Sequence, residues 1–266
     1  MRANVITLLT DFGSKDPYVA AMKGVIISIA PHVRLVDITH EISKFNVIEG
    51  AFVLASAAKY FPKGTIHVGV VDPGVGTKRR AIIVSTKSYL FVGPDNGLLM
   101  LAANNEELLG VYEIVNPKYM LRDISSTFHG RDIFAPVAAH LANGVQPEEI
   151  GKKVEDYVKL PFPEPKVREY QVSGRVIYID GFGNIVTNIC REIINELGIK
   201  KGDIIHVKIG EHVLRLPFYK SYGYVQKGEL LALIDSYNML EIAVNMGNAA
   251  KRLKINVGDE VCIEVQ

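Results

Sequence analysis

Residues 67–84 read HVGVVDPGVGTKRRAIIV, in which two apolar runs flank a Pro-Gly-Val-Gly turn and a basic segment. The β-branched residues of both runs favour strands, and the glycines suit the unusual backbone angles of a tight turn. The first run ends at Asp72, and the basic segment places Arg79 at the start of the second run. The stretch therefore predicts two successive strands with an acid and a guanidinium at their connection.

Outward from this stretch, the first 160 residues alternate short β-branched runs with helical patterns. Apolar strands separated by amphipathic helices indicate a mostly parallel sheet that is covered on both faces. We therefore expect an α/β domain over residues 1–160, with an N-terminal mostly parallel sheet flanked by helices. The expected strands are 5–9, 33–38, 65–71, 80–86 and 89–93, and the expected helices are 18–30 and 47–60.

The pattern changes after the segment LPFPEPK at residues 160–166, which carries three prolines and predicts an extended linker over about residues 160–167. Beyond it, short alternating segments with turns between them are typical of antiparallel strands. We expect a smaller C-terminal, mostly antiparallel β domain, barrel-like, over residues 168–266. Its strand segments are VSGRVIYID, DIIHVKIG, HVLRLPF, LLALID, MLEIAV and VCIEV.

Composition limits the classes of partner. The chain has 266 residues, of which 48% are hydrophobic and 22% charged, as in ordinary globular proteins. Thirty basic side chains oppose 29 acidic ones, so no general field favours binding to nucleic acid or an anionic membrane. Two cysteines, Cys190 and Cys262, with no signal sequence, favour a reducing cytoplasm over a disulfide framework. We expect a cytoplasmic protein with a small-molecule partner.

Three acids stand at or near the carboxyl ends of predicted strands, where ligands bind in open α/β sheets. They are Asp11, Asp37 and Asp72. Asp11 has a second interpretation, in which it only braces its turn while Asp16, followed by Pro17, starts a helix. The turn after Asp72 matches neither the GxxxxGK[ST] nor the GxGxxG phosphate-binding pattern, so its glycines alone do not indicate a nucleotide site.

The segment STFHGRDIFAPVAAHLA at residues 126–142 places His129, Arg131 and Asp132 before an amphipathic helix. An imidazole beside a guanidinium and a carboxylate is a candidate site for acid–base chemistry. Each residue also has a structural interpretation, in which Asp132 starts the helix and His129 is an ordinary loop residue.

A second candidate segment, IDGFGNIVTNI, covers residues 179–189 in the predicted β domain. A hairpin turn explains its glycines. It does not explain Phe182 and Asn184, which suit stacking on a heterocyclic base and hydrogen bonding to it.

Together these segments resemble the S-adenosylmethionine hydroxide adenosyltransferases, also called S-adenosylmethionine hydrolases, which are related to the fluorinase and chlorinase enzymes. The resemblance covers almost the whole chain and is carried by TDFGSKDPYVAAMKG, VDITHEISKFNVIEGA, VDPGVGTKRRA, GPDNGLL, TFHGRDIFAPVAAHLA, IDGFGNIVTNI and IDSYNMLEIAVN. It implies cleavage of S-adenosyl-L-methionine at the ribose 5′ carbon by water, giving adenosine and L-methionine without a cofactor or metal. It also implies a homotrimer, with each substrate held between the α/β domain of one subunit and the β domain of its neighbour.

The resemblance assigns roles in the α/β domain to residues of this sequence. Asp72, Arg79 and His129 match the Asp, Arg and His that the family's hydrolases carry together beside the reacting water. Asp11 matches the acid that holds the ribose hydroxyls, and Phe45 an aromatic that lines the nucleoside pocket. On this basis we hypothesise that Asp72 and His129 hold the water while Arg79 provides charge support.

The methionine and adenine contacts are assigned in the same way. Asp180, Phe182 and Asn184 match the segment that meets adenine and the amino group. Asp16 and Ser236 match residues on the side of the amino-acid tail. Glu241 has two interpretations, a contact to the substrate ammonium or an outward-facing strand residue. Tyr237 and Val244 stand where the halogenating relative has arginines, which leaves open how the carboxylate of methionine is bound. Val244 is also assigned to the substrate-binding residues.

The departures from the family pattern favour a hydrolase. A halogenating member has a tyrosine at the position of Asp72, and a carboxylate there repels an approaching halide. Val75 and Gly130 replace residues that carry hydroxyl groups in the fluorinating relative. Two alternatives stay open from sequence: a halide-dependent adenosyltransferase of the same fold, and a non-catalytic sensor of adenosine or S-adenosylmethionine.

Overall fold

The computed structural model describes residues 4–168 and 170–264. By its internal contacts the chain divides into two units, Met1–Pro161 and Phe162–Gln266. Their boundary falls in the proline-rich segment that the sequence marks as a linker. Each unit has its own hydrophobic core.

The N-terminal unit contains a seven-stranded sheet in the order β2-β1-β3-β5-β4-β6-β7. The pairs β2-β1, β1-β3 and β3-β5 are parallel, which confirms the predicted α/β class. The strands are β1 (Val5–Thr10), β2 (Arg34–Thr39), β3 (Ile66–Val70), β4 (Ala81–Thr86), β5 (Leu90–Pro94), β6 (Leu108–Ile114) and β7 (Gly151–Val154).

The sheet continues with antiparallel pairs from β5 through β4 and β6 to β7, an extension that the sequence does not predict. Only residues 87–89 connect β4 to β5. Parallel pairing needs a crossover of about a dozen residues, so this short connection permits only an antiparallel hairpin.

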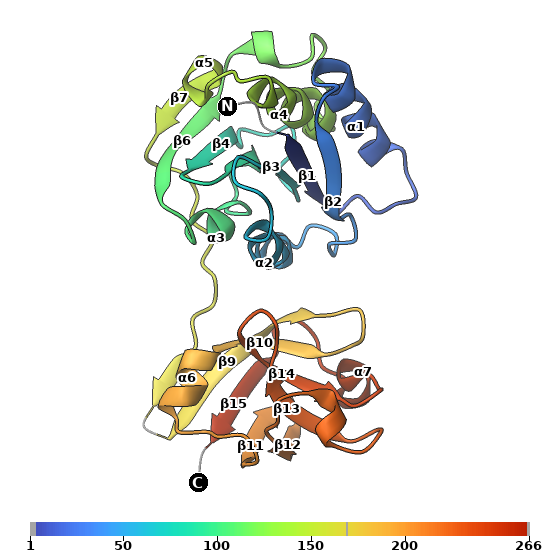
Figure 1. Ribbon diagram of the computed structural model, residues 1–266, viewed down its shortest axis with the longest axis vertical. Helices are drawn as coiled ribbons and strands as arrows, with labels where there is room; N and C mark the ends of the chain where they lie inside the picture. The colour runs from blue at the N-terminus through green and yellow to red at the C-terminus, as the bar shows by residue number, and fades with distance from the viewer. Residues whose placement is uncertain (1–3, 169, 265–266) are drawn as a thin grey trace. The chain divides into compact units, whose positions relative to one another are not determined.

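Helices cover both faces of this sheet, as Figure 1 shows. On one face, α1 (Tyr18–Ile29) and α4 (Ala135–Ala142) pack on residues of β1 and β3. On the other, α2 (Val47–Ala58) and α3 (Met100–Ala103) cover a second apolar cluster. Shorter helical segments are η1 (Pro117–Tyr119), η2 (Gly130–Phe134) and α5 (Pro147–Ile150). Among the described residues, no helix combines the length and the apolar character needed to span a membrane.

The C-terminal unit is an eight-stranded antiparallel sheet in the order β12-β11-β15-β9-β10-β14-β13, with β8 paired to β9. A bridge between Phe218 and Ala232 connects the two ends of this order, so the sheet is nearly closed and the predicted barrel-like β class is confirmed. The strands are β8 (Lys166–Arg168), β9 (Gln171–Ile179), β10 (Ile185–Cys190), β11 (Ile204–Ile209), β12 (His212–Pro217), β13 (Leu230–Ile234), β14 (Met239–Val244) and β15 (Glu260–Glu264).

Three short helical segments connect strands of this unit: α6 (Arg191–Glu196), η3 (Tyr222–Tyr224) and α7 (Ala249–Leu253). The interior is apolar, with Val207, Ile242 and Ile263 fully buried. The last predicted strand, VCIEV, ends at residue 265, which lies outside the described residues.

Candidate active site

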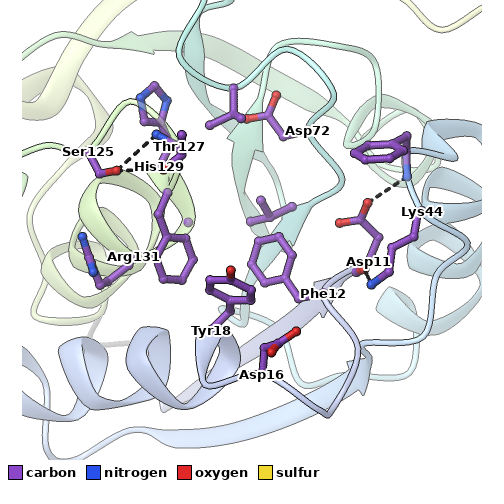
Figure 2. Close-up of a pocket in the computed structure, with 15 residues that line it drawn as sticks. Asp11, Phe12, Asp16, Tyr18, Lys44, Asp72, Ser125, Thr127, His129 and Arg131 are labelled. Atoms are coloured by element: carbon purple, nitrogen blue, oxygen red, sulfur yellow. Dashed lines mark hydrogen bonds between the residues drawn. The ribbon is translucent and has the colours of Figure 1, made fainter.

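The carboxyl ends of β1 and β3 open onto a cavity of about 530 Å³ in the N-terminal unit. Figure 2 shows Asp11 and Asp72 on its wall, and residue 125 and residues 127–131 form another part of that wall. Asp11 directly follows β1, and Asp72 follows β3 after one intervening residue. Two of the three strand-end acids thus meet at one cavity, as the sheet geometry predicts.

Arg79 connects Asp72 to His129. Its Nε donates to Asp72 Oδ1 at 3.1 Å, and its Nη2 donates to Asp72 Oδ2 and, at 3.0 Å, to His129 Nδ1. The guanidinium and the carboxylate are both nearly buried, with side-chain exposures of 8% and 5%. The structure therefore brings together the three side chains that the resemblance assigns to catalysis.

The turn that carries Asp72 packs against the segment that carries His129. Gly76 has φ +76°, and a Cβ atom there would lie 2.1 Å from the carbonyl oxygen of Ser126. Only glycine allows this approach of two backbones. Gly76 of the segment DPGVGT is therefore required for the contact between the two loops.

His129 precedes a single π-helical turn, η2, in which the Ala135 amide donates to the Gly130 carbonyl. Such turns are rare and often lie at functional sites. Asp132 is fully buried, accepts the Ser125 amide at 2.8 Å and forms an ion pair with Arg131. The interpretation of Asp132 as a helix start is wrong, because α4 follows Phe134 and has no side-chain cap, and Asp132 instead shapes the loop that carries His129.

Asp11 is held by the segment before α2. Its Oδ2 accepts the Phe45 amide at 2.8 Å, and Lys44 Nζ donates to its backbone carbonyl. Phe45 has φ +65°, a strained conformation for a residue with a side chain, and the residue is 68% exposed. Asp11 therefore braces this turn, while its Oδ1 accepts no hydrogen bond from the described residues and lies at the cavity.

The two other acids near these strands differ in position. Asp16 is exposed and lines the cavity, but the interpretation of Asp16 as a helix start is wrong. The residue that precedes α1 is Pro17, and it makes no side-chain capping hydrogen bond. Asp37 lies outside the cavity lining and forms ion pairs with Lys23 at 2.6 Å and His40 at 3.0 Å.

An aromatic wall completes this cavity, and the sequence analysis missed it. The rings of Phe12, Tyr18 and Phe128 meet edge to face, with centroids 5.1 to 5.8 Å apart. Phe12 and Phe128 are the chain neighbours of Asp11 and His129. Apolar walls with a few polar groups are typical of small-molecule sites.

Two of the cavities in the C-terminal unit, of about 430 and 650 Å³, share Asp180, Phe182 and Tyr222. Asp180 Oδ1 accepts the amides of Phe182 and Asn184 at 2.9 Å, and its Oδ2 accepts Asn184 Nδ2 at 2.9 Å. These bonds fix the β9-β10 hairpin turn, in which Phe182 is 79% exposed. The remaining predicted contacts also line these cavities: Ser236 and Glu241 the smaller, Asn184 and Val244 the larger.

Glu241 lies on the face of β14 opposite the core residues Leu240 and Ile242, which agrees with an outward-facing strand residue, but it is only 3% exposed. The Tyr222 hydroxyl donates to its Oε1 at 2.9 Å. Burial raises the pKa of Glu241 to about 7, the nearby Asp235 and Asp180 act in the same direction, and the Tyr222 hydrogen bond opposes the shift. Tyr222 carries no sequence signal that separates it from the neighbouring tyrosines, and it was missed.

Comparison with known proteins identifies the family of this chain. The family model described as SAM hydroxide adenosyltransferase N-terminal domain matches residues 6–151, and the corresponding C-terminal domain matches residues 174–262. The chain therefore belongs to the SAM hydroxide adenosyltransferase family.

Among individual relatives, the (R)-S-adenosyl-L-methionine hydrolase of Methanocaldococcus jannaschii is 40% identical, over 97% of this chain and 95% of the relative. A fluorinase of Nocardia brasiliensis is 28% identical, over 99% and 98%. The crystal structure of an uncharacterized conserved protein from Thermotoga maritima matches with a TM-score of 0.94 at 42% identity, covering 98% of this chain and all of that one.

The raised pKa of Glu241 predicts a pH-dependent effect of Glu241→Gln on stability. Above pH 4.5, the ordinary pKa of a glutamate, the unfolded chain releases the Glu241 proton while the folded protein keeps it. The stability that the protonated carboxyl contributes is therefore lost as the pH rises through about 7. Glutamine keeps an acceptor for Tyr222 and has no charge to bury. We expect the variant to gain about 2 kcal/mol in the free energy of unfolding at about pH 8 and little at about pH 5.

Urea unfolding at both pH values measures this difference. Glu211→Gln, at an exposed position of the same unit, is the matched control and should change neither value. An equal effect of Glu241→Gln at the two pH values contradicts the prediction.

Proposed function

We propose that the protein hydrolyses S-adenosyl-L-methionine at the ribose 5′ carbon and releases adenosine and L-methionine. The observation that carries the proposal is the cluster of Asp72, Arg79 and His129 at a cavity with aromatic walls. The family membership and the higher identity to a named hydrolase than to a fluorinase support it. The name of that relative specifies the (R) epimer at sulfur, and we propose the same epimer here.

The site residues divide the substrate between them in this proposal. Asp11 has an unused Oδ1 at the cavity, which suits a bond from the adjacent ribose hydroxyls. The exposed rings of Phe45 and Phe182 suit stacking on adenine. Asn184 and Glu241 offer polar groups for the base and the ammonium, and Asp16, Ser236 and Val244 line the regions assigned to the tail.

The reaction needs few groups. A sulfonium leaves as a neutral thioether, so no general acid is required, and the main task is to align the oxygen nucleophile with the breaking bond. If hydroxide attacks the cation, opposite charges cancel in the transition state, which a dry site with fixed dipoles favours. No cofactor enters the proposed reaction.

The discrimination against halide is smaller than a bare carboxylate suggests. Arg79 makes two hydrogen bonds to Asp72 and compensates its charge. Chloride and fluoride therefore need a direct test as alternative nucleophiles.

We also propose that the protein is a cytoplasmic homotrimer with its substrate sites between subunits. The resemblance to the family and the free state of both cysteines support this proposal. Analytical ultracentrifugation should give three times the 29.4 kDa of the chain. A monomer or dimer at micromolar concentration contradicts it.

The proposed activity predicts that purified protein converts S-adenosyl-L-methionine to adenosine and L-methionine, identified by chromatography and mass. Each sulfur epimer is tested with and without chloride or fluoride. A 5′-halogenated nucleoside supports the halide-dependent alternative, and intact substrate bound without turnover supports the sensor.

Asp72→Asn should lower kcat by about 100-fold or more, because the amide no longer accepts both bonds from Arg79 or orients the nucleophile. Asp37→Asn is the matched control, since this strand-end acid lies outside the cavity lining and should leave kcat within about twofold. A rate near wild type for Asp72→Asn removes Asp72 from the mechanism.

A further inference from the structure

Arg79 contacts residues of the cavity wall without lining the cavity itself. Asp72 and His129 line the cavity, whereas the described lining does not include Arg79. Its guanidinium carbon lies 5.5 Å from the centre of the Phe134 ring, and its side chain is almost fully buried. Arg79 is therefore placed to act on the reaction through its neighbours.

Four of the five guanidinium N–H donors of Arg79 have partners within the protein. Nε and one N–H of Nη2 serve Asp72, and the second N–H of Nη2 serves His129. Nη1 donates to the Arg80 carbonyl at 3.1 Å. A guanidinium has five N–H donors, so one at most is left for any other partner.

The bond between Arg79 and His129 has only one possible direction. Arginine has no acceptor, so His129 Nδ1 must accept, which requires a neutral ring with its proton on Nε2. Burial lowers the pKa of His129, the charge of Arg79 lowers it further, and the charges of Asp72 and Asp132 oppose these effects. Nε2–H has no partner among the described residues and belongs to a ring that lines the cavity.

We infer that Arg79 is a positioning residue that fixes His129 as its Nε2–H tautomer, so that His129 donates a hydrogen bond to the attacking oxygen and does not remove its proton. The inference rests on the proposed function and assigns one step of it. The earlier hypothesis placed Arg79 beside the water as charge support. The inference instead has Arg79 act on the reaction only through its hydrogen bonds to Asp72 and His129.

The proposed reaction does not need His129 as a base. An oxygen lone pair forms the bond to the 5′ carbon while the carbon–sulfur bond breaks and leaves its electron pair on sulfur. When the nucleophile is water, its surplus proton leaves through the Asp72 carboxylate to solvent. When it is hydroxide, no proton is transferred. In both cases the lone pair of His129 Nδ1 continues to accept the hydrogen bond from Arg79.

Nitrogen-15 NMR of histidine-labelled full-length protein tests the tautomer without substrate. The chain has 7 histidines, so the His129 signals are assigned by their loss in His129→Gln. At about pH 7.5 we expect an unprotonated Nδ1 and a protonated Nε2. In Arg79→Gln we expect a mixture of tautomers. Arg80→Gln is the matched control, because the Arg80 side chain pairs with Asp95 and Asp156 and should leave the tautomer unchanged.

Kinetics test the role of the donor. His129→Gln offers an amide N–H but no base, and should keep kcat within about tenfold of wild type, whereas His129→Ala should lose about 100-fold. Equal losses in the two variants, or an Nδ1–H or doubly protonated ring in the wild-type spectrum, overturn the inference. The spectrum is independent of turnover, so failure of the inference can be separated from failure of the proposed hydrolysis.

Discussion

One buried guanidinium connects the two loops that form the candidate active site. Arg79 bonds the carboxylate of Asp72, after β3, and the imidazole of His129, before α4. Removing one partner of a buried ion pair leaves an uncompensated charge and is strongly destabilising. The neighbouring features serve this contact, because Gly76 permits the close approach of the loops and Asp132 holds the segment that carries His129.

The two units supply different chemistry to the proposed function. The N-terminal unit holds the charged cluster at the ends of parallel strands, where an α/β sheet offers a site. The C-terminal unit holds an exposed aromatic ring on a rigid hairpin and a buried acid, Glu241. Such an acid lowers stability near neutral pH, as functional groups often do. The fold thus gives up some stability to place a carboxyl group in a cavity.

The sequence predicts the fold class well, because continuous apolar runs and amphipathic helices have distinct periods. It does not predict the antiparallel half of the first sheet, because a strand that is buried on both faces has the same apolar pattern whether it pairs in parallel or antiparallel. The trio proposed for catalysis, Asp72, Arg79 and His129, could be predicted only by family resemblance, because Arg79 and His129 lie 50 residues apart. Tyr222 and the ring of Tyr18 had no local signal, and the direction of a hydrogen bond exists only in the folded chain.

In the proposed reaction a solvent oxygen attacks the ribose 5′ carbon beside Asp72 and His129. Hydrolysis in water enriched in oxygen-18, followed by mass spectrometry of both products, shows which carbon receives the oxygen. We expect the label in the 5′ oxygen of adenosine and none in methionine. Unlabelled adenosine, or a labelled product of cleavage on the amino-acid side of sulfur, would rule out attack at the 5′ carbon.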